Sequence, residues 1–390
     1  MLVSNGRPGL TPVADALNQL LESVSPIVDV EMVSLANALG RVLAKNQISL
    51  VDVPPADNSA MDGYAVCIAD FDNPGSNILS SDSNDVVTLP ISQRIPAGCA
   101  PMDLESKSVA RIFTGAEVPQ GADAIVMQES AQVIKGGVIE DRVSFSAKPM
   151  LGEHIRPKGQ DIRKDSVVVA KGKKLRAQDL GLQIFNSNRY TLTGLVKGMG
   201  FELVDLGVVG DTAEETELAL TEGSQKADCI VSCGGVSVGE EDYVKSAVEK
   251  LGSLRLWKLA IKPGKPLAFG DVKGVPFLGL PGNPAAVFVT YCIIARPYLL
   301  KLQGSNQWHP MKLKVKAGFA IKKPGTRQEY LRTKMEVDEL GETRVVIYPN
   351  QSSGVLASAA WGDGFAILPI GGTVEQGAMI DFIAYDSVLN

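Results

Sequence analysis

Apolar residues near the N-terminus follow the spacing of a helix. They are Val13, Leu17, Leu20, Leu21 and Val24. Thr11 and Pro12 precede them, a capping hydroxyl followed by a proline that suits the first helical turn. The pattern predicts one helix here and a second helix over residues 32–44.

The helical period disappears between residues 51 and 149. Short apolar runs at 86–89, 109–113 and 124–127 alternate with turns rich in glycine and proline, which is typical of a small β domain. The stretch 151–183 is mixed, with a strand predicted at 167–169 and a helix from Gln178.

Strands and helices alternate regularly from residue 184 to residue 304. Helices are predicted at 190–199, 213–220, 242–251 and 285–302, and strands at 202–209, 228–232, 254–261 and 276–280. This alternation is typical of a doubly wound α/β domain, a parallel sheet with helices on both faces. Such sheets bind ligands beyond the carboxyl ends of their strands, so we expect the site in those loops.

Alternating strands return after Gly304, at 313–315, 333–337, 344–348, 366–368 and 379–384, with a hairpin at 338–343. These patterns therefore predict a multidomain protein of the α/β plus β class. We predict a mixed linker domain in two segments (1–50 and 150–183), a small β domain (51–149), the doubly wound domain (184–304) and a C-terminal β domain (305–390).

Charge and residue usage exclude several classes of protein and kinds of site. A net charge of −6 argues against a general nucleic-acid binder, so any anion site must gather lysine and arginine locally. The five cysteines form no CxxC pair, and two histidines exclude a multi-histidine metal site. The N-terminus lacks a secretion pattern, and the apolar stretch 285–300 is interrupted by Arg296 and too short to span a bilayer. We therefore expect a cytoplasmic protein that does not act on a membrane.

Two segments of the α/β part suit phosphate chemistry. GGVSVGEEDY, from Gly234 to Tyr243, follows an apolar strand, and its glycines let the backbone approach a phosphate. Asp242 there either caps the next helix or binds Mg²⁺ or a pterin. WKLAIKPGKP, at 257–266, places three lysines around a Pro-Gly turn, which suits an oxyanion, although a plain charged loop has the same composition.

Other polar segments have an ordinary structural interpretation. LPGNP at 280–284 suits a helix start. The segments 57–66, 113–116 and 156–161 carry the residue types that turns favour in any protein. His154, beside the last of them, is expected to be structural.

Taken in order, these segments resemble the molybdopterin molybdotransferases, the family of bacterial MoeA and the gephyrin E-domain. The matching segments are DNSAMDGYAV, FTGAEVPQGADAIVMQE, IRPKGQDI, SCGGVSVGEEDY, WKLAIKPGKP and LPGNP. The resemblance implies a homodimer of four-domain chains with a barrel-like C-terminal domain. It also implies a reaction in which molybdate enters adenylylated molybdopterin, Mg²⁺ assists and AMP leaves, with the molybdopterin adenylyltransferase as a partner.

The resemblance further implies the site residues. Asp62, Asp211 and Asp242 would bind Mg²⁺ and share the catalysis with Lys258 and Lys262. The residues expected to bind substrate are Thr114, Arg156, Asp161, Gly234, Gly235, Ser237, Lys265, Arg332 and Ser353. Asp62, Thr114, Arg156 and Asp161 are expected from the partner subunit across the dimer cleft. These residue types fit the chemistry, since molybdate is a dianion and a carboxylate-held cation helps to break a phosphoanhydride.

Two departures from the family matter. Ala286 stands where the family has a serine, so one hydroxyl for molybdate is missing. At the junction Gln183-Ile184 the family has a first parallel strand and a Ser-Thr-Gly-Asp-Glu-Leu motif, which this chain lacks. A sheet without that strand would expose apolar surface, so we favour a segment missing from the sequence as read over a true deletion. The intact mass of the protein distinguishes the two.

The sequence is also compatible with two other functions. A molybdopterin adenylyltransferase has a similar α/β domain and GGVS loop, but it consumes ATP and does not need the flanking β domains. A non-catalytic scaffold would bind molybdopterin without turnover. The sequence also leaves molybdenum and tungsten undistinguished.

Overall fold

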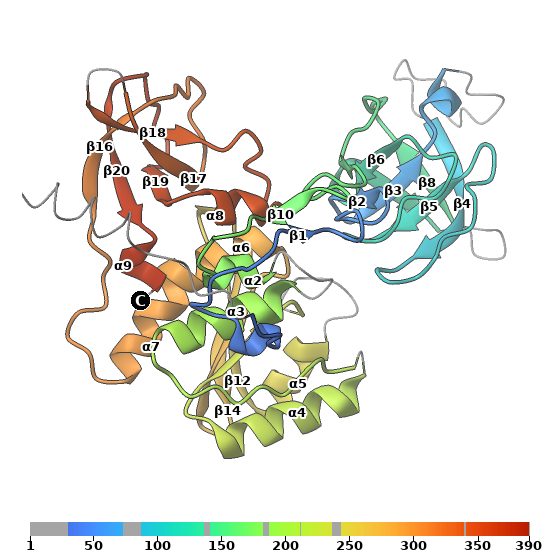
Figure 1. The fold of residues 1–390 in the computed structure, drawn as a ribbon. Coiled ribbons are helices and arrows are strands. Elements are labelled where there is room, and N and C mark those ends of the chain that lie inside the picture. The colour runs from blue at the N-terminus through green and yellow to red at the C-terminus, as the bar shows by residue number, and fades with distance from the viewer. Residues whose placement is uncertain are drawn as a thin grey trace, which may run out of the picture.

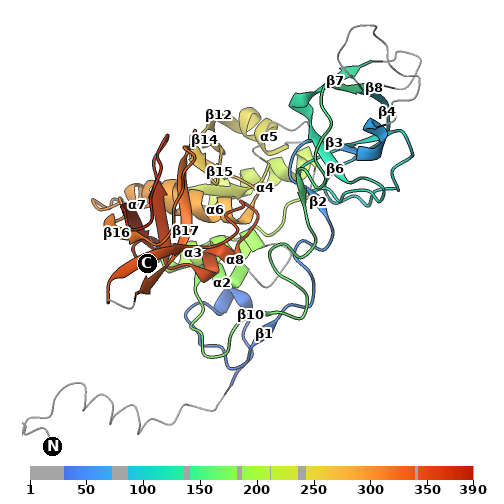
Figure 2. The same ribbon diagram turned by 90° about the horizontal axis from the view of Figure 1, so that it is seen from above.

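The computed structural model describes residues 30–72, 87–135, 141–181, 187–210, 212–235, 243–338 and 341–389. Figures 1 and 2 show the small β domain standing apart at one end, while the α/β domain and the C-terminal β domain lie against each other. The predicted helix at residues 13–24 lies outside the described residues. The multidomain α/β-plus-β class is confirmed.

Pairs of short strands build the linker. β1 (Gln47–Ile48) pairs with β10 (Val167–Val169), β2 (Asn58–Ser59) pairs with β9 (Ile155–Arg156), and α2 (Ala177–Gly181) follows. The helix predicted over 32–44 is wrong, because only a 3-10 turn forms at Leu35–Asn37. Gly40 turns the chain with φ +77°, and its N–H donates to the carbonyl of Leu175 at 2.9 Å, so a distant segment takes this backbone out of a helix.

The small β domain is a six-stranded sheet in the order β6-β3-β5-β4-β8-β7. Its strands are β3 (Gly63–Val66), β4 (Val87–Ile95), β5 (Val109–Ile112), β6 (Ala124–Met127), β7 (Ala131–Ile134) and β8 (Arg142–Phe145), with 3-10 turns at Ile68–Phe71 and Gln128–Ser130. Val126 and Phe145 pack on one face, and Ile112 and Ile125 on the other. The three strands predicted here are confirmed, because residues of both faces are buried.

The α/β domain holds a four-stranded sheet in the order β11-β15-β14-β12. The strands are β11 (Ile230–Cys233), β12 (Gly252–Lys258), β14 (Pro266–Val272) and β15 (Val275–Leu280). β11 and β15 are parallel as predicted, but β14 is antiparallel to β15 and to β12. The prediction of an all-parallel sheet is therefore wrong for β12 and β14, and β14 was not predicted. A tight turn at Lys273 and Gly274 folds β14 back on β15 as a hairpin.

Residues 202–209 form no strand, contrary to the prediction. Within the described part of the chain, β11 is the edge of the sheet and no strand lies beyond it. A strand needs a neighbour for its N–H and C=O groups, and this segment has none. Asp205 instead pairs with Arg189 at 3.0 Å. The junction Gln183-Ile184, where the resemblance predicts a missing first strand, lies outside the described residues.

Helices cover both faces of this sheet (Figure 1). α4 (Ala213–Lys226) and α5 (Tyr243–Leu251) pack on one face through Leu220, Ala247 and Val248. α3 (Ser187–Gly198) and the helix that follows β15 pack on the other face, where Leu195 is buried with Leu278 and Leu280.

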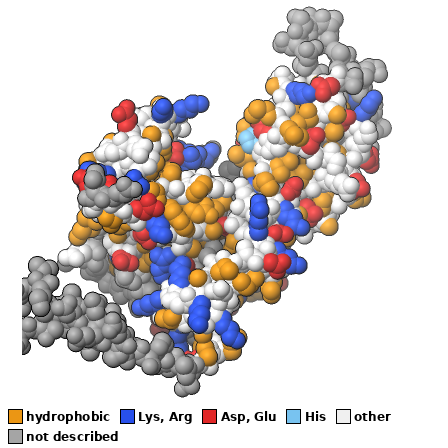
Figure 3. Space-filling model, turned by 45° about the horizontal axis from the view of Figure 1, so that its top comes forward, with side chains coloured by type: hydrophobic (Ala, Val, Ile, Leu, Met, Phe, Trp, Pro, Cys, Tyr) orange, Lys and Arg blue, Asp and Glu red, His pale blue; other side chains and the backbone are white. Residues whose placement is uncertain are grey.

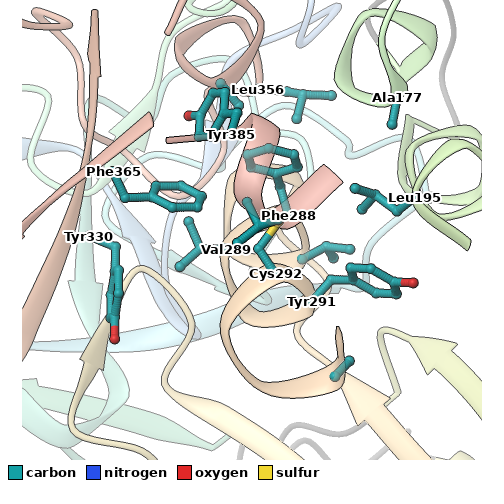
Figure 4. Packing of buried hydrophobic residues seen from close by; sticks show 14 of the residues in the cluster. Ala177, Leu195, Phe288, Val289, Tyr291, Cys292, Tyr330, Leu356, Phe365 and Tyr385 are labelled. Carbon is teal, nitrogen blue, oxygen red and sulfur yellow. The ribbon is translucent and has the colours of Figure 1, made fainter. Parts of the chain in front are cut away.

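The helix after β15 is the core of the molecule. It runs through α6 (Pro284–Thr290), a π-helical turn (Tyr291–Ala295) and α7 (Arg296–Leu302). Figure 4 shows Phe288 and Cys292 packed between Leu195 of α3 and Tyr385 of the C-terminal domain. By length and composition this 19-residue helix could cross a membrane, so the prediction that it is too short is wrong. Its residues are 61% buried inside the protein, as in a core helix.

The C-terminal domain is a closed five-stranded barrel. Its strands follow the order β17-β18-β16-β20-β19, and β19 pairs back with β17. They are β16 (Leu313–Ala317), β17 (Gln328–Val337), β18 (Thr343–Ile347), β19 (Gly364–Leu368) and β20 (Met379–Ala384), with α8 (Ala357–Trp361) and α9 (Asp386–Leu389). β13 (Ile261–Lys262), which follows β12, pairs in parallel with β17. The predicted barrel-like domain and the β17–β18 hairpin are confirmed.

Candidate active site

The loops that follow β11 and β15 lie against each other. Gly234 and Gly235 have φ values of 81° and 68°, which residues with a Cβ rarely adopt. The N–H of Gly234 donates to the carbonyl of Leu280 at 3.1 Å, and a Cβ on Gly282 would lie 3.6 Å from the Cα of Gly234. The structure thus brings the glycine loop and LPGNP together at the carboxyl ends of two parallel strands. Three predicted site residues, Asp211, Ser237 and Asp242, lie outside the described residues.

Asn188, which no motif predicted, joins these loops to α3. Its Nδ2 donates to the carbonyl of Gly282 at 2.7 Å. Burial raises the pKa of the neighbouring Cys233 thiol, and a hydrogen bond with Asn188 partly opposes that rise. Asn188 therefore holds the ends of β11 and β15 at a fixed separation. Its only signal in the sequence is its place two residues before the helix predicted at 190–199.

The start of α6 is a meeting point for two other parts of the chain. Pro284 occupies the first turn, as LPGNP predicted, but the Asn283 side chain caps no backbone N–H. Asn283 Oδ1 instead accepts from Arg156 Nη1 at 3.3 Å. The N–H of Ala285 donates to the carbonyl of Ser353 at 2.9 Å, which brings in the barrel loop before α8.

Arg156 and Asp161 reach this region within one chain. A Cβ on Gly354 would lie 4.0 Å from the Arg156 guanidinium, and burial lowers the pKa of Arg156. Asp161 accepts from the backbone N–H groups of Leu356 and Ala357, both at 3.1 Å. The resemblance predicted that both residues act across a dimer. Here the segment after β9 runs past the barrel of its own chain and places them beside α6 and α8.

Asp62 and Thr114 are brought together, but in the small β domain. Asp62 Oδ1 accepts from the backbone N–H of Thr114 at 2.8 Å and from its hydroxyl at 2.9 Å. Figure 1 shows this domain apart from β12 and β14 of the α/β sheet. Among the described residues, the side-chain hydrogen bonds of Asp62 are to Thr114 and none joins either residue to the α/β domain.

The lysine turn, residues 261–266, packs against α6. Gly264 has φ +112°, and a Cβ there would overlap the Thr290 hydroxyl and lie 3.6 Å from the carbonyl oxygen of Ala286. Lys262 Nζ lies 3.1 Å from Glu329 Oε1 of β17, whereas Lys265 is exposed. The backbone of Lys258 belongs to β12, and its side chain lies outside what the structure describes.

Arg332 is enclosed behind the Ser353 loop. Its side chain is among the largest that are fully buried, and burial lowers its pKa to about 10. Its guanidinium donates to the carbonyl of Ser352 at 3.1 Å and to Ser358 Oγ at 3.0 Å. Arg332 thereby fixes the loop that carries Ser353 against α6. Ala286 is buried in the same helix start and offers no hydroxyl.

The burial of Asp161 makes stability depend on pH. Burial raises its pKa to about 6 from an ordinary 3.8. Because the folded state binds this proton more tightly, the contribution of Asp161 to stability is complete below about pH 4 and is lost as pH rises through 6. We expect the free energy of unfolding of the wild type, relative to Asp161→Asn, to fall by about 2 kcal/mol between pH 4 and pH 7. Urea unfolding of both proteins across this range measures the difference; parallel curves would contradict the assignment.

The described residues contain no group of three or more His, Cys, Asp or Glu placed to bind a metal. Figure 3 shows the surface indented between the two lobes of the molecule, with hydrophobic side chains (orange) in the middle and several basic side chains (blue) near its margins. The part of the site that the structure describes is thus a basic, glycine-lined region built around the start of α6.

Three family models match the chain in order. They are the MoeA N-terminal region (domain I and II) at residues 11–184, the probable molybdopterin binding domain at 167–301 and the MoeA C-terminal region (domain IV) at 314–385. A crystal structure of a molybdopterin biosynthesis MoeA protein from Pyrococcus horikoshii aligns with 24% identity over 96% of this chain and 99% of that chain, at a TM-score of 0.43.

Relatives of known name match over nearly the whole chain. Molybdopterin molybdenumtransferase of Haemophilus influenzae is 33% identical over 390 aligned positions, covering 90% of this chain and 93% of that protein. Because 90% of this chain is fewer than 390 residues, some of the aligned positions of the relative face gaps in this chain. The Nostoc protein of the same name is 32% identical, covering 94% and 91%, and Dictyostelium gephyrin is 26% identical, covering 98% and 63%. With three domain matches in order and a third of its residues shared with such a relative, the chain belongs to the molybdopterin molybdenumtransferase family.

Proposed function

We propose that this transferase inserts molybdate into adenylylated molybdopterin and releases AMP. The observation that carries the proposal is the convergence of three elements on the start of α6. These are the lysine turn, the Ser353 loop of the barrel and, through LPGNP, the glycine loop after β11. Cationic side chains are the partners that an oxyanion needs, and the lysine turn brings two lysines to this place.

Each predicted residue has a role in this arrangement. Lys262 and Lys265 would neutralise molybdate, with Ser353 binding its oxygens and Arg332 fixing the Ser353 loop. Lys258 and Arg156 would face the phosphates. The backbone of Gly234 and Gly235, with Ser237, would approach the pterin phosphate, which a Cβ would obstruct.

Mg²⁺ is part of the proposal. Carboxylate oxygens are the donors that Mg²⁺ prefers, and the resemblance assigns Asp211 and Asp242, which lie outside the described residues, to the ion. When bound there, the ion would supply positive charge to the phosphoanhydride. Asp62 and Thr114 belong to the small β domain, which stands apart from the α/β domain of its own chain (Figure 1), so we assign them to the site of the partner subunit.

A homodimer follows from that assignment. Apolar side chains are exposed on and beside the linker, as expected of a surface that a second subunit covers. They are Val42 (63% exposed), Leu50 (81%), Met150 (72%), Leu151 (80%) and Val167 (52%). We propose further that the protein works in the cytoplasm and receives its substrate from the molybdopterin adenylyltransferase.

The test is release of AMP from adenylylated molybdopterin by the purified protein, with and without molybdate. We expect release only with molybdate. Equal release in both, or consumption of ATP, would favour the adenylyltransferase. Binding of molybdopterin with no turnover would favour a scaffold. Repeating the assay with tungstate shows whether the site distinguishes the two metals.

A further inference from the structure

A single carboxylate stands among the cations of the lysine turn. β13 and the start of β17 pair, and their segments, 261–266 and 327–332, contain two lysines and two arginines. Glu329 is the one acidic residue in these two segments. Its role in the site is not implied by any of the motifs.

Glu329 is placed to act on Lys262. The two residues are direct partners in the β13–β17 ladder, and Lys262 Nζ lies 3.1 Å from Glu329 Oε1. The glutamate side chain is 16% exposed and that of the lysine 44%. The carboxylate is thus the more buried member, and solvent screens the pair less than it screens an exposed one.

The same carboxylate acts on the second cation behind the turn. The charge of Glu329 raises the pKa of Arg332 and so opposes the effect of burial on that residue. Lys265, by contrast, is exposed and forms no ion pair with any residue that the structure describes. The lysines of the turn are therefore unequal, since one is neutralised by the barrel and the other keeps its full charge.

We propose that Glu329 is a positioning residue that sets how strongly the lysine turn binds an oxyanion. It holds Lys262 against the barrel and lowers the positive charge that Lys262 offers to a dianion. The anion is then bound firmly enough to react but weakly enough to exchange. This inference rests on the proposed function, because it takes molybdate as the anion.

The test is the Kd of molybdate for the wild type and for Glu329→Gln, measured by titration calorimetry. The amide keeps the shape of the side chain and a carbonyl oxygen for Lys262, but not the charge. We expect a Kd roughly fivefold lower at low ionic strength, with the difference shrinking as salt screens the freed lysine. Asp381→Asn is the matched control, because it breaks another ion pair of the barrel, Lys314–Asp381 at 2.7 Å, and should leave Kd unchanged.

A double-mutant cycle with Lys262→Gln separates positioning from direct repulsion. The gain from Glu329→Gln should disappear when Lys262 is already glutamine. A gain that persists in that background, or a Kd that does not fall in Glu329→Gln, would overturn the inference. Should Glu329→Gln not fold, Glu329→Thr, which also removes the charge and suits a strand, takes its place in both comparisons. Failure of the wild type to bind molybdate would count against the proposed function, whereas binding without this response counts against Glu329 alone.

Discussion

Replacement of Lys265 by glutamine should lower kcat/KM for molybdate-dependent AMP release by about two orders of magnitude. Lys265 is the exposed cation of the turn that packs on the start of α6, and no residue that the structure describes neutralises it. A lost charge-assisted contact with a dianion costs about 2–3 kcal/mol, which corresponds to this factor. Initial rates at several molybdate concentrations measure it, and most of the loss should be in KM.

Lys273→Gln is the control for that loss. It removes the same charge from an exposed lysine of the same domain, in the β14–β15 turn. Its activity should match the wild type. Equal losses in both variants would mean that the overall charge of the domain matters, and an active Lys265→Gln enzyme would place the anion elsewhere.

Gly264→Ala should destabilise the protein by about 3 kcal/mol and abolish most of the activity. The backbone at φ +112° is strained for any residue with a Cβ, and the added methyl would overlap the buried Thr290 hydroxyl. Relief requires the lysine turn to move away from α6, which displaces Lys262 and Lys265 from the proposed anion site. Urea unfolding and the AMP assay measure the two effects.

Gly274→Ala separates strain from overlap. Gly274 also has a positive φ, +84°, but a Cβ there meets nothing within 4 Å. This variant should cost about 1 kcal/mol and keep its activity. If Gly264→Ala behaved in the same way, the close packing of the turn on α6 would have no role in the site.

Local sequence patterns predicted the helices and strands whose formation depends on the burial of their own apolar residues. The strand at 124–127 and the helix at 285–302 formed as expected, because Ile125 and Phe288 are fully buried where the apolar spacing placed them. Prediction failed where a segment distant in the sequence determines the local backbone structure. Residues 32–44 bond to the chain around Leu175 instead of forming a helix, and residues 202–209 have no neighbour to make them a strand.

The site was predictable as motifs but not as contacts. Glycines and lysines indicate a phosphate site by their residue type, so the loops that carry them could be found from the sequence. Asn188 and Glu329 are ordinary polar residues until strand register and helix packing bring them to Gly282 and Lys262. The placement of Arg156 beside its own barrel likewise depends on how two domains dock, which no local pattern contains.

The pairing of β13 with β17 bears on how the enzyme can move. The lysine turn continues directly into β14 of the α/β sheet, yet its first strand hydrogen-bonds to the barrel. A hinge motion that separated these two domains would break the contacts of the lysine turn with one of them. The small β domain stands apart from both (Figure 2), so it can move without breaking this pairing. The lysine turn can therefore keep its position between the α/β sheet and the barrel while that domain moves.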